Sequence, residues 1–120
     1  MASVPPYMLR NFYVDGSLQN TENGFQFTLK NTIDSGTLLG LTKLEVDDRS
    51  YAPEEVLVGK EAPVQKASEI SYQKPLYFHY GQTLTVKALG EPLEPGAHEI
   101  RMTISTAEIG RITIPIEATL

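Results

Sequence analysis

Hydrophobic and polar residues alternate along four segments of the chain. In "GFQFTLKN", Phe25, Phe27 and Leu29 fall on one side, and the residues between them are polar or small. Because successive side chains of a strand point to opposite faces, this period of two predicts strands with one buried face. The same pattern occurs over residues 83–88, 98–105 and 111–118. Weaker matches predict further short strands over residues 12–19, 38–47, 55–58, 68–72 and 76–80.

Turn residues separate these segments and set the predicted fold class. "TENG", "VDDRSY" and "LEPGAHEI" each place turn-forming residues between two candidate strands. Pro115 interrupts the last strand and has no amide hydrogen, which predicts an edge strand or a bulge at that point. No window has convincing helical periodicity. We therefore expect an all-β fold: an antiparallel β-sandwich of eight or nine short strands, immunoglobulin-like in general architecture, with a small barrel as the alternative.

The chain length fits a single domain. The 120 residues contain no internal repeat, linker or low-complexity tract. The two prolines in "MASVPPYMLRNF" interrupt the apolar patch at the start of the chain. We expect residues 1–10 to form an N-terminal arm outside the sheets and residues 11–120 to form one sandwich domain.

Charge and composition narrow the classes of partner. Ten basic and fifteen acidic residues give a formal net charge of -5, and the basic residues are scattered. Nucleic acids and anionic membranes are therefore not expected partners, because both require clustered positive charge. The absence of cysteine excludes disulfides, thiolate metal sites and a cysteine nucleophile. With no signal-peptide pattern or membrane-spanning apolar run, the sequence predicts a cytoplasmic protein.

The search for catalytic motifs predicts no catalytic, cofactor-binding or metal-ligating residue in this chain. "LVGKEAP" has a Gly-Lys pair but lacks the upstream glycine and the following hydroxyl of a phosphate-binding loop. His79 and His98 are the only histidines. His98 falls on the apolar face of its strand, and we expect its ring nitrogens to be hydrogen-bonded or hydrated at the end of a sheet. The carboxylate pairs lie in or beside turns, where nothing predicts a raised pKa.

Aromatic residues gather in two stretches, near residue 10 and around "LYFHYGQTLTV". Alternation over residues 76–80 places Phe78 and Tyr80 on the buried face and Tyr77 and His79 on the outward face. The outward pair is either a surface cross-strand pair or part of a partner surface. Gly81 and the next residue are expected to form a hairpin turn or a bulge.

Three segments in order carry a resemblance to a known family. They are "NGFQFTLKN", "LTKLEVDDRSYAPEEVLVG" and "LYFHYGQTLTVKALGEPLEPGAHEIRMTI". Together they are similar to the small β subunit of bacterial C-glycoside deglycosidases, over most of the chain after the first ten residues. The sequence departs from that family's pattern around Gly81 and at "VDDR".

The resemblance implies a β-sandwich that binds a larger catalytic α subunit with a (β/α)8-barrel fold, in a higher-order αβ assembly. In that family the α subunit holds the acid–base residues and a divalent metal, which we expect to be manganese. The complex cleaves the carbon–carbon bond between the sugar and the aromatic aglycone of 3-oxo-C-glucosides. No metal ligand or catalytic residue of the family falls on this chain.

The resulting hypothesis is a non-catalytic β subunit that binds and stabilises the metal-dependent α subunit. The residues expected at the interface are Tyr7, Met8, Phe12, Tyr77 and His79. One alternative is a stand-alone carbohydrate-binding module whose exposed tyrosines stack on sugar rings. Another is an enzyme in its own right, with His79 as a general base, although the sequence shows no pocket around it.

Overall fold

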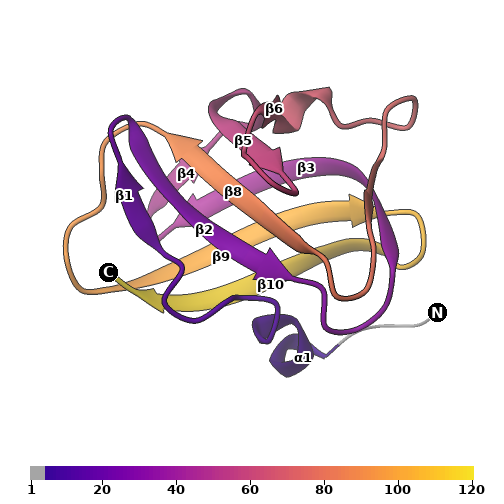
Figure 1. The fold of residues 1–120 in the computed structure, drawn as a ribbon, viewed down its shortest axis with the longest axis horizontal. Helices are drawn as coiled ribbons and strands as arrows, with labels where there is room; N and C mark the ends of the chain where they lie inside the picture. Colours follow the sequence, from indigo (N-terminus) through magenta and orange to yellow (C-terminus); the bar gives the residue numbers. More distant parts are fainter. Residues whose placement is uncertain (1–4) are drawn as a thin grey trace.

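The four strongly alternating segments form long strands of two antiparallel sheets. The computed structural model describes residues 5–120, which form a β-sandwich (Figure 1). The first sheet has the order β1 (Gln19–Thr21), β2 (Gly24–Lys30), β8 (Thr83–Leu89), β5 (Val56–Gly59) and β6 (Gln65–Lys66). The second has the order β10 (Gly110–Thr119), β9 (Ala97–Thr106), β3 (Gly36–Val46) and β4 (Arg49–Tyr51), and β7 (Leu76–Phe78) also pairs with β3. The predicted fold class, an all-β antiparallel sandwich, is confirmed.

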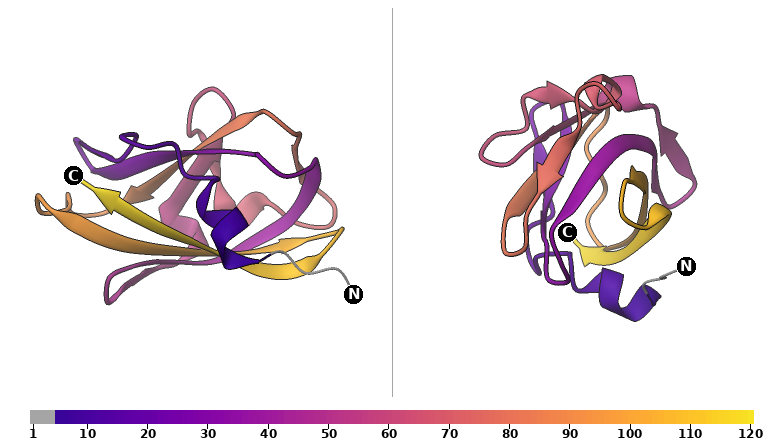
Figure 2. Two further views of the ribbon diagram at one scale, coloured as in Figure 1. Left: turned by 90° about the horizontal axis from the view of Figure 1, so that it is seen from below. Right: turned by 90° about the vertical axis from the view of Figure 1, so that its right-hand side faces the viewer.

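The register of the strands places apolar residues opposite one another. Phe27 pairs with Val86 between β2 and β8, and Ile114 pairs with Met102 between β10 and β9. Paired residues of an antiparallel ladder lie on the same face, so each pair adds to one buried layer. The two layers meet in a single core (Figure 2). Its fully buried large side chains are Phe25, Phe27, Leu29, Leu44, Leu84, Ile100, Met102, Ile114, Ile116, Val46, Val56 and Val58.

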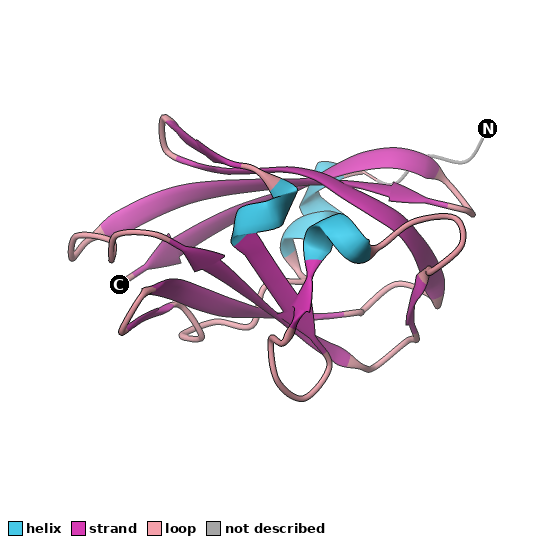
Figure 3. Ribbon diagram, turned by 90° about the horizontal axis from the view of Figure 1, so that it is seen from above, coloured by secondary structure: helices cyan, strands magenta, loops and turns pink. Residues whose placement is uncertain are grey.

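Short helices close the sides of the sandwich. The helix α1 (Pro6–Arg10) packs against β10, and Leu9 on α1 is buried in the core. On another side, the 3-10 helices η1 (Pro53–Glu55) and η2 (Ala67–Glu69) lie between β3 and β5 (Figure 3). Within the part of the chain that the structure describes, no helix is long and apolar enough to span a membrane.

The edges of the second sheet agree with one specific prediction. Pro115 lies on β10, opposite Arg101 of β9, and β10 is an edge strand. Proline is tolerated there because an edge strand needs no amide hydrogen on its outer side. The predicted edge position of this strand is therefore confirmed. Gly96, in the turn before β9, has a positive φ of 120°.

Two of the weaker predicted strands are wrong. Residues 12–18 lie outside any named strand and contribute one bridge, between Tyr13 and Leu29. The chain turns at Gly16, whose φ is 79°, before β1 begins. Residues 68–72 form part of η2 and a bend in which Ser71 and Lys74 exchange backbone hydrogen bonds. Ten strands occur among residues 5–120, more than the eight or nine predicted, because β1, β4 and β6 are too short to produce an alternation signal.

The turn after β7 corrects two further predictions. Because β7 and β8 belong to different sheets, residues 79–82 carry the chain between sheets and do not form a hairpin. The Gln82 N–H donates to the His79 carbonyl at 3.0 Å, and Gly81 has a φ of 85°, as a type II turn requires at its third residue. Tyr80 was expected in the core but is exposed, because β7 ends at Phe78 and the alternation ends with it.

The predicted N-terminal arm, residues 1–10, includes the helix α1, and the division of the chain into arm and domain stays a prediction. Residues 1–4 of the predicted arm lie outside the described residues. Residues 6–10 form α1, which is outside both sheets.

Candidate functional site

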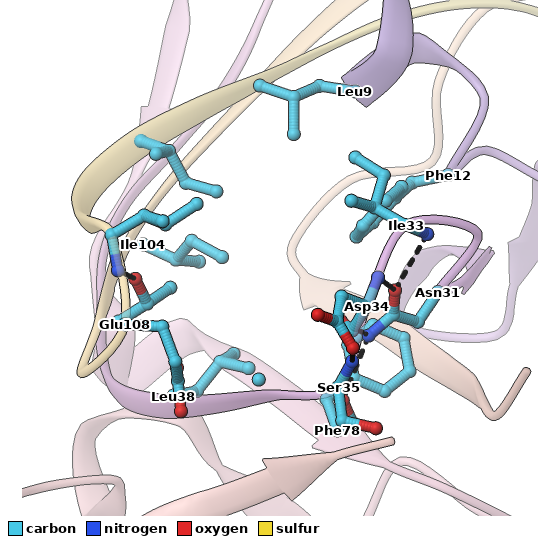
Figure 4. A pocket seen from close by; sticks show the side chains of 14 residues that line it. Leu9, Phe12, Asn31, Ile33, Asp34, Ser35, Leu38, Phe78, Ile104 and Glu108 are labelled. Carbon is cyan, nitrogen blue, oxygen red and sulfur yellow. Dashed lines mark hydrogen bonds between the residues drawn. The ribbon is translucent and has the colours of Figure 1, made fainter. Parts of the chain in front are cut away.

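An apolar cavity of about 250 Å³ opens beside α1, between the second sheet and the loop that joins β2 to β3 (Figure 4). One wall belongs to the second sheet and its β9–β10 turn, and contains Leu38, Ile104, Ile109 and Ile112. The opposite wall contains Phe12, Ile33 and Phe78, and Leu9 of α1 lies at one end. We call this space the apolar cavity.

Backbone pairing after α1 positions the aromatic wall of the cavity. The Lys30 N–H donates to the Phe12 carbonyl at 2.6 Å, which ties this segment to the end of β2. The Phe12 ring then meets Phe78 edge-on, with ring centroids 6.3 Å apart and an interplanar angle of 82°. Edge-to-face pairs of this kind add stabilisation beyond the area that they bury. The cavity wall is therefore a packed part of the fold.

Asn31 connects three segments at the base of the cavity. Its amide nitrogen donates to the carbonyls of Asp34 at 2.7 Å and Phe78 at 2.9 Å. Its side-chain oxygen accepts the N–H groups of Ile33 and Asp34, at 3.1 and 3.2 Å. Asn31 is the buried polar residue of the core, only 3% exposed. Its role was not predicted from the sequence, where the only local signal is an asparagine between a strand and the turn residues Asp34 to Gly36.

Two carboxylates lie among the residues that line the cavity. Glu108 accepts hydrogen bonds from Thr37, from its N–H at 2.8 Å and from its hydroxyl at 2.9 Å. The backbone N–H of Thr37 is the main reason that the pKa of Glu108 lies below its ordinary value. Asp34 accepts the N–H of Ser35 at 2.8 Å. Both carboxylate groups are on exposed residues, so the opening of the cavity is acidic.

A separate polar cluster surrounds His98. Its Nδ1 lies 2.8 Å from Asp47 Oδ2, and its Nε2 lies 2.6 Å from the Glu94 carbonyl. The hydrogen bond to Asp47 is the main cause that raises the pKa of His98, and the Glu94 carbonyl adds to it. The pKa of Asp47 is lowered, first by the N–H of Glu99 and then by His98. The expected role of His98, a hydrogen-bonded histidine at a sheet end, is confirmed.

Three exposed tyrosines lie on β7 and in the turns beside it. Tyr72, Tyr77 and Tyr80 expose 81%, 53% and 65% of their surface, and we call them the tyrosine surface. β7 is a short strand that pairs with the beginning of β3. The N–H of Tyr80 donates to the Ser35 hydroxyl at 2.9 Å, so this surface adjoins the opening of the apolar cavity.

The structure separates the residues predicted at an interface. Tyr77 and His79 are exposed, as expected from their alternation. Tyr7 is exposed on α1, and Met8 is partly buried there. Phe12 is buried in the core and lines the cavity, so its ring does not lie on an open surface. A role of these residues in partner contact stays a prediction. Among the described residues, no group of three or more His, Asp or Glu side chains is placed to hold a metal ion.

A family model matches nearly the whole chain. The family model described as hydroxymethylglutaryl-CoA reductase, N-terminal domain, matches residues 8–120. The match begins within α1 and continues through β10, so it covers the whole sandwich. No curated protein matches the chain.

This match overturns the predicted resemblance to the β subunit of C-glycoside deglycosidases, and with it the predicted function in carbon–carbon bond cleavage. It also replaces the alternative of a carbohydrate-binding module. The three segments that suggested the resemblance are strands joined by proline and glycine turns, and such patterns recur in unrelated sandwiches. The match does not bear on the expected barrel-type partner, its manganese ion or the cytoplasmic location, which stay predictions.

Proposed function

Because the chain belongs to the family of hydroxymethylglutaryl-CoA reductase N-terminal domains, we propose that it is a docking domain of such an enzyme. In this role the sandwich holds the catalytic part of a reductase through the tyrosine surface. The observation that carries the proposal is the exposure of Tyr72, Tyr77 and Tyr80 within nine residues of one strand and its flanking turns. The reduction itself is assigned to the catalytic part.

Tyrosines in this arrangement have the properties of interface residues. A tyrosine buries a large apolar ring at a low cost in side-chain entropy, and its hydroxyl accepts or donates a hydrogen bond at the rim. Aromatic residues are enriched in the cores of protein interfaces, and a few of them supply most of the binding energy. An exposed group of three on a protein of this size therefore supports contact with another protein surface.

The backbone of β7 also supports docking at this position. Among the described residues, β7 has β3 as its only ladder partner, and it is three residues long. Its second edge thus offers backbone hydrogen-bonding groups beside Tyr77. Exposed sheet edges receive an added strand from a partner in one common mode of peptide recognition.

Co-purification with the catalytic part tests the proposal. The chain and the reductase catalytic region from the same source are produced together and separated by size-exclusion chromatography. We expect one complex, and we expect Tyr77→Ser combined with Tyr80→Ser to weaken it at least about tenfold. Val64→Ser is the matched control, because Val64 is 79% exposed and lies outside the tyrosine surface. Separate elution of the two proteins, or equal weakening by Val64→Ser, would contradict the docking role.

A further inference from the structure

We propose that the apolar cavity binds a small uncharged molecule with one or two apolar rings. Its volume of about 250 Å³ exceeds the ~150 Å³ of an engineered cavity, lined by leucine, isoleucine and phenylalanine, that takes up benzene. The present cavity has the same kinds of lining residue and room for a fused two-ring molecule. This inference does not depend on the docking role, because none of the three tyrosines lines the cavity.

The shape of the cavity suits a flat apolar guest. One wall belongs to the second sheet and the other to the β2–β3 loop and the segment after α1, and Figure 4 shows Ile104 on one side facing Phe12 and Ile33 on the other. A molecule between these walls has apolar side chains on both of its faces. Burial of apolar surface contributes roughly 25 cal/mol per Å², so ring-shaped guests gain most of their affinity from this contact.

The polar groups of the cavity are already satisfied within the fold. Asn31 donates both of its amide hydrogens and accepts two backbone hydrogen bonds, which uses its full hydrogen-bonding capacity. The Ser35 hydroxyl accepts the N–H of Tyr80, and both oxygens of Glu108 accept from Thr37. A bound water needs two to four polar partners, and these groups offer few. The site therefore selects ligands by shape and apolar surface.

Negative charge at the opening of the cavity disfavours anionic ligands. The carboxylates of Asp34 and Glu108 belong to the lining, and the formal net charge of the chain is -5. An anionic ligand would meet this negative potential and would also lose its hydration on entering the cavity. Neutral ligands avoid both costs, so a neutral molecule is preferred over its carboxylate analogue.

Two matched probes test this selectivity on the full chain. 2-Naphthalenemethanol is neutral, and 2-naphthoate has the same rings with a carboxylate. In a titration followed by backbone amide chemical shifts, we expect saturable binding of 2-naphthalenemethanol, with the largest shifts around Ile33, Leu38 and Ile109. We expect 2-naphthoate to bind at least about tenfold more weakly. Equal affinity of the two probes, no saturable binding, or largest shifts at the tyrosine surface would overturn the proposal.

A variant that fills the cavity and a matched variant that does not provide a second test. Ile109 is half-buried in the β9–β10 turn and lines the cavity, whereas Ala107 in the same turn is exposed and does not line it. We expect Ile109→Trp to reduce the affinity for 2-naphthalenemethanol at least about tenfold and Ala107→Trp to leave it unchanged. If Ile109→Trp does not fold, Ile112→Phe fills the same space from another half-buried position. Binding that survives filling in a folded variant would overturn the proposal.

The acidic opening has its own variant. Asp34→Asn removes one negative charge and keeps an oxygen that accepts the Ser35 N–H. We expect this variant to bind 2-naphthoate several-fold more tightly than the parent chain and 2-naphthalenemethanol equally well. Sedimentation of each variant reports self-association. A change in oligomeric state with Ile109→Trp, together with no binding of 2-naphthalenemethanol by the parent chain, would assign the cavity to contact between copies and reject the ligand site.

Discussion

The Nδ1 atom of His98 lies 2.8 Å from Oδ2 of Asp47, which is in the turn that joins β3 to β4. Its Nε2 lies 2.6 Å from the Glu94 carbonyl. A carboxylate and a carbonyl only accept hydrogen bonds, so the ring satisfies both only when both nitrogens carry hydrogen. The geometry thus selects the positively charged imidazolium. His98 in this form joins the β3–β4 turn to the segment before β9.

Stability should therefore depend on pH through His98. Because folding raises the pKa of His98 above its ordinary value of 6.5, its contribution is fully present below that value. The contribution is lost as the pH rises through the folded-state pKa. We expect the free energy of unfolding in urea to fall from about pH 6 to about pH 9 by about 1 kcal/mol or less, since solvent screens the partly exposed pair. His98→Gln should remove this part of the pH dependence, and an unchanged profile would contradict the imidazolium assignment.

The acidic side of the profile depends on Asp47, with the opposite sign. Folding lowers the pKa of Asp47 below its ordinary value of 3.8, mainly through the Glu99 N–H and then through His98. The contribution of Asp47 is present above the unfolded-state pKa and is lost as the pH falls through the folded-state pKa. Between these two regions, both partners are charged and the pair contributes most.

Asp47 also contributes through its backbone conformation. Two substitutions distinguish this contribution from the contribution of its charge. Its φ is 55°, and among the described residues Asp47 is the one residue other than glycine in the left-handed region. Asparagine tolerates this conformation and keeps an acceptor for the Glu99 N–H at 3.0 Å, whereas alanine does neither as well. We expect Asp47→Asn to cost less than about 1 kcal/mol in urea unfolding, and Asp47→Ala to cost about 2 kcal/mol. Equal losses would show that charge alone matters at this turn.

Asn31 gives the strongest test of the cavity wall. Replacing it with alanine leaves the buried Phe78 carbonyl, the partly buried Asp34 carbonyl and two backbone N–H groups without their side-chain partner. An unsatisfied buried polar group costs roughly 1–3 kcal/mol, so we expect Asn31→Ala to lower the free energy of unfolding by about 3 kcal/mol. Asn11→Ala is the matched control on an exposed residue and should change it by less than about 0.5 kcal/mol. Similar urea midpoints for the two variants would remove Asn31 from this role.

The sequence predicted the features that depend on neighbours along the chain. The alternation of Phe25, Phe27 and Leu29 is local, and β2 follows from it. The outward direction of Tyr77 and the edge position of Pro115 also follow from local rules, the period of two and the missing amide hydrogen. Tyr80 was placed wrongly because the same period was extended beyond the end of β7.

The cavity could not be predicted, because its parts are distant in sequence. Asn31 reaches the Phe78 carbonyl across 47 positions, and Glu108 reaches Thr37 across 71. No pattern within a window of a few residues reports such contacts. The family was assigned wrongly for a related reason: strands and Pro-Gly turns such as the one before β9 reflect sandwich geometry, which many unrelated functions share. The family model that spans residues 8–120 was needed to distinguish one family of sandwiches from another.

Two glycines of the sheets should respond oppositely to the same substitution. A Cβ at Gly24 would lie 1.9 Å from the Ala88 carbonyl oxygen, on the neighbouring strand β8, and the φ of Gly24 is 156°. A Cβ at Gly40 of β3 would meet no atom within 4 Å, and its φ is not in the positive region. The Gly24 contact involves backbone, so β2 and β8 must separate locally to relieve it, whereas alanine at Gly40 only reduces the entropy of the unfolded chain.

We therefore expect Gly24→Ala to destabilise the fold by about 3 kcal/mol and Gly40→Ala to stabilise it by about 0.5 kcal/mol. Urea unfolding of both variants, with amide hydrogen exchange at β2 and β8, measures the difference. The exchange data locate the damage, since faster exchange should be confined at first to the end of the β2–β8 ladder where Gly24 pairs with Leu89. Equal stability of the two variants would show that these strands do not approach as closely as the structure places them.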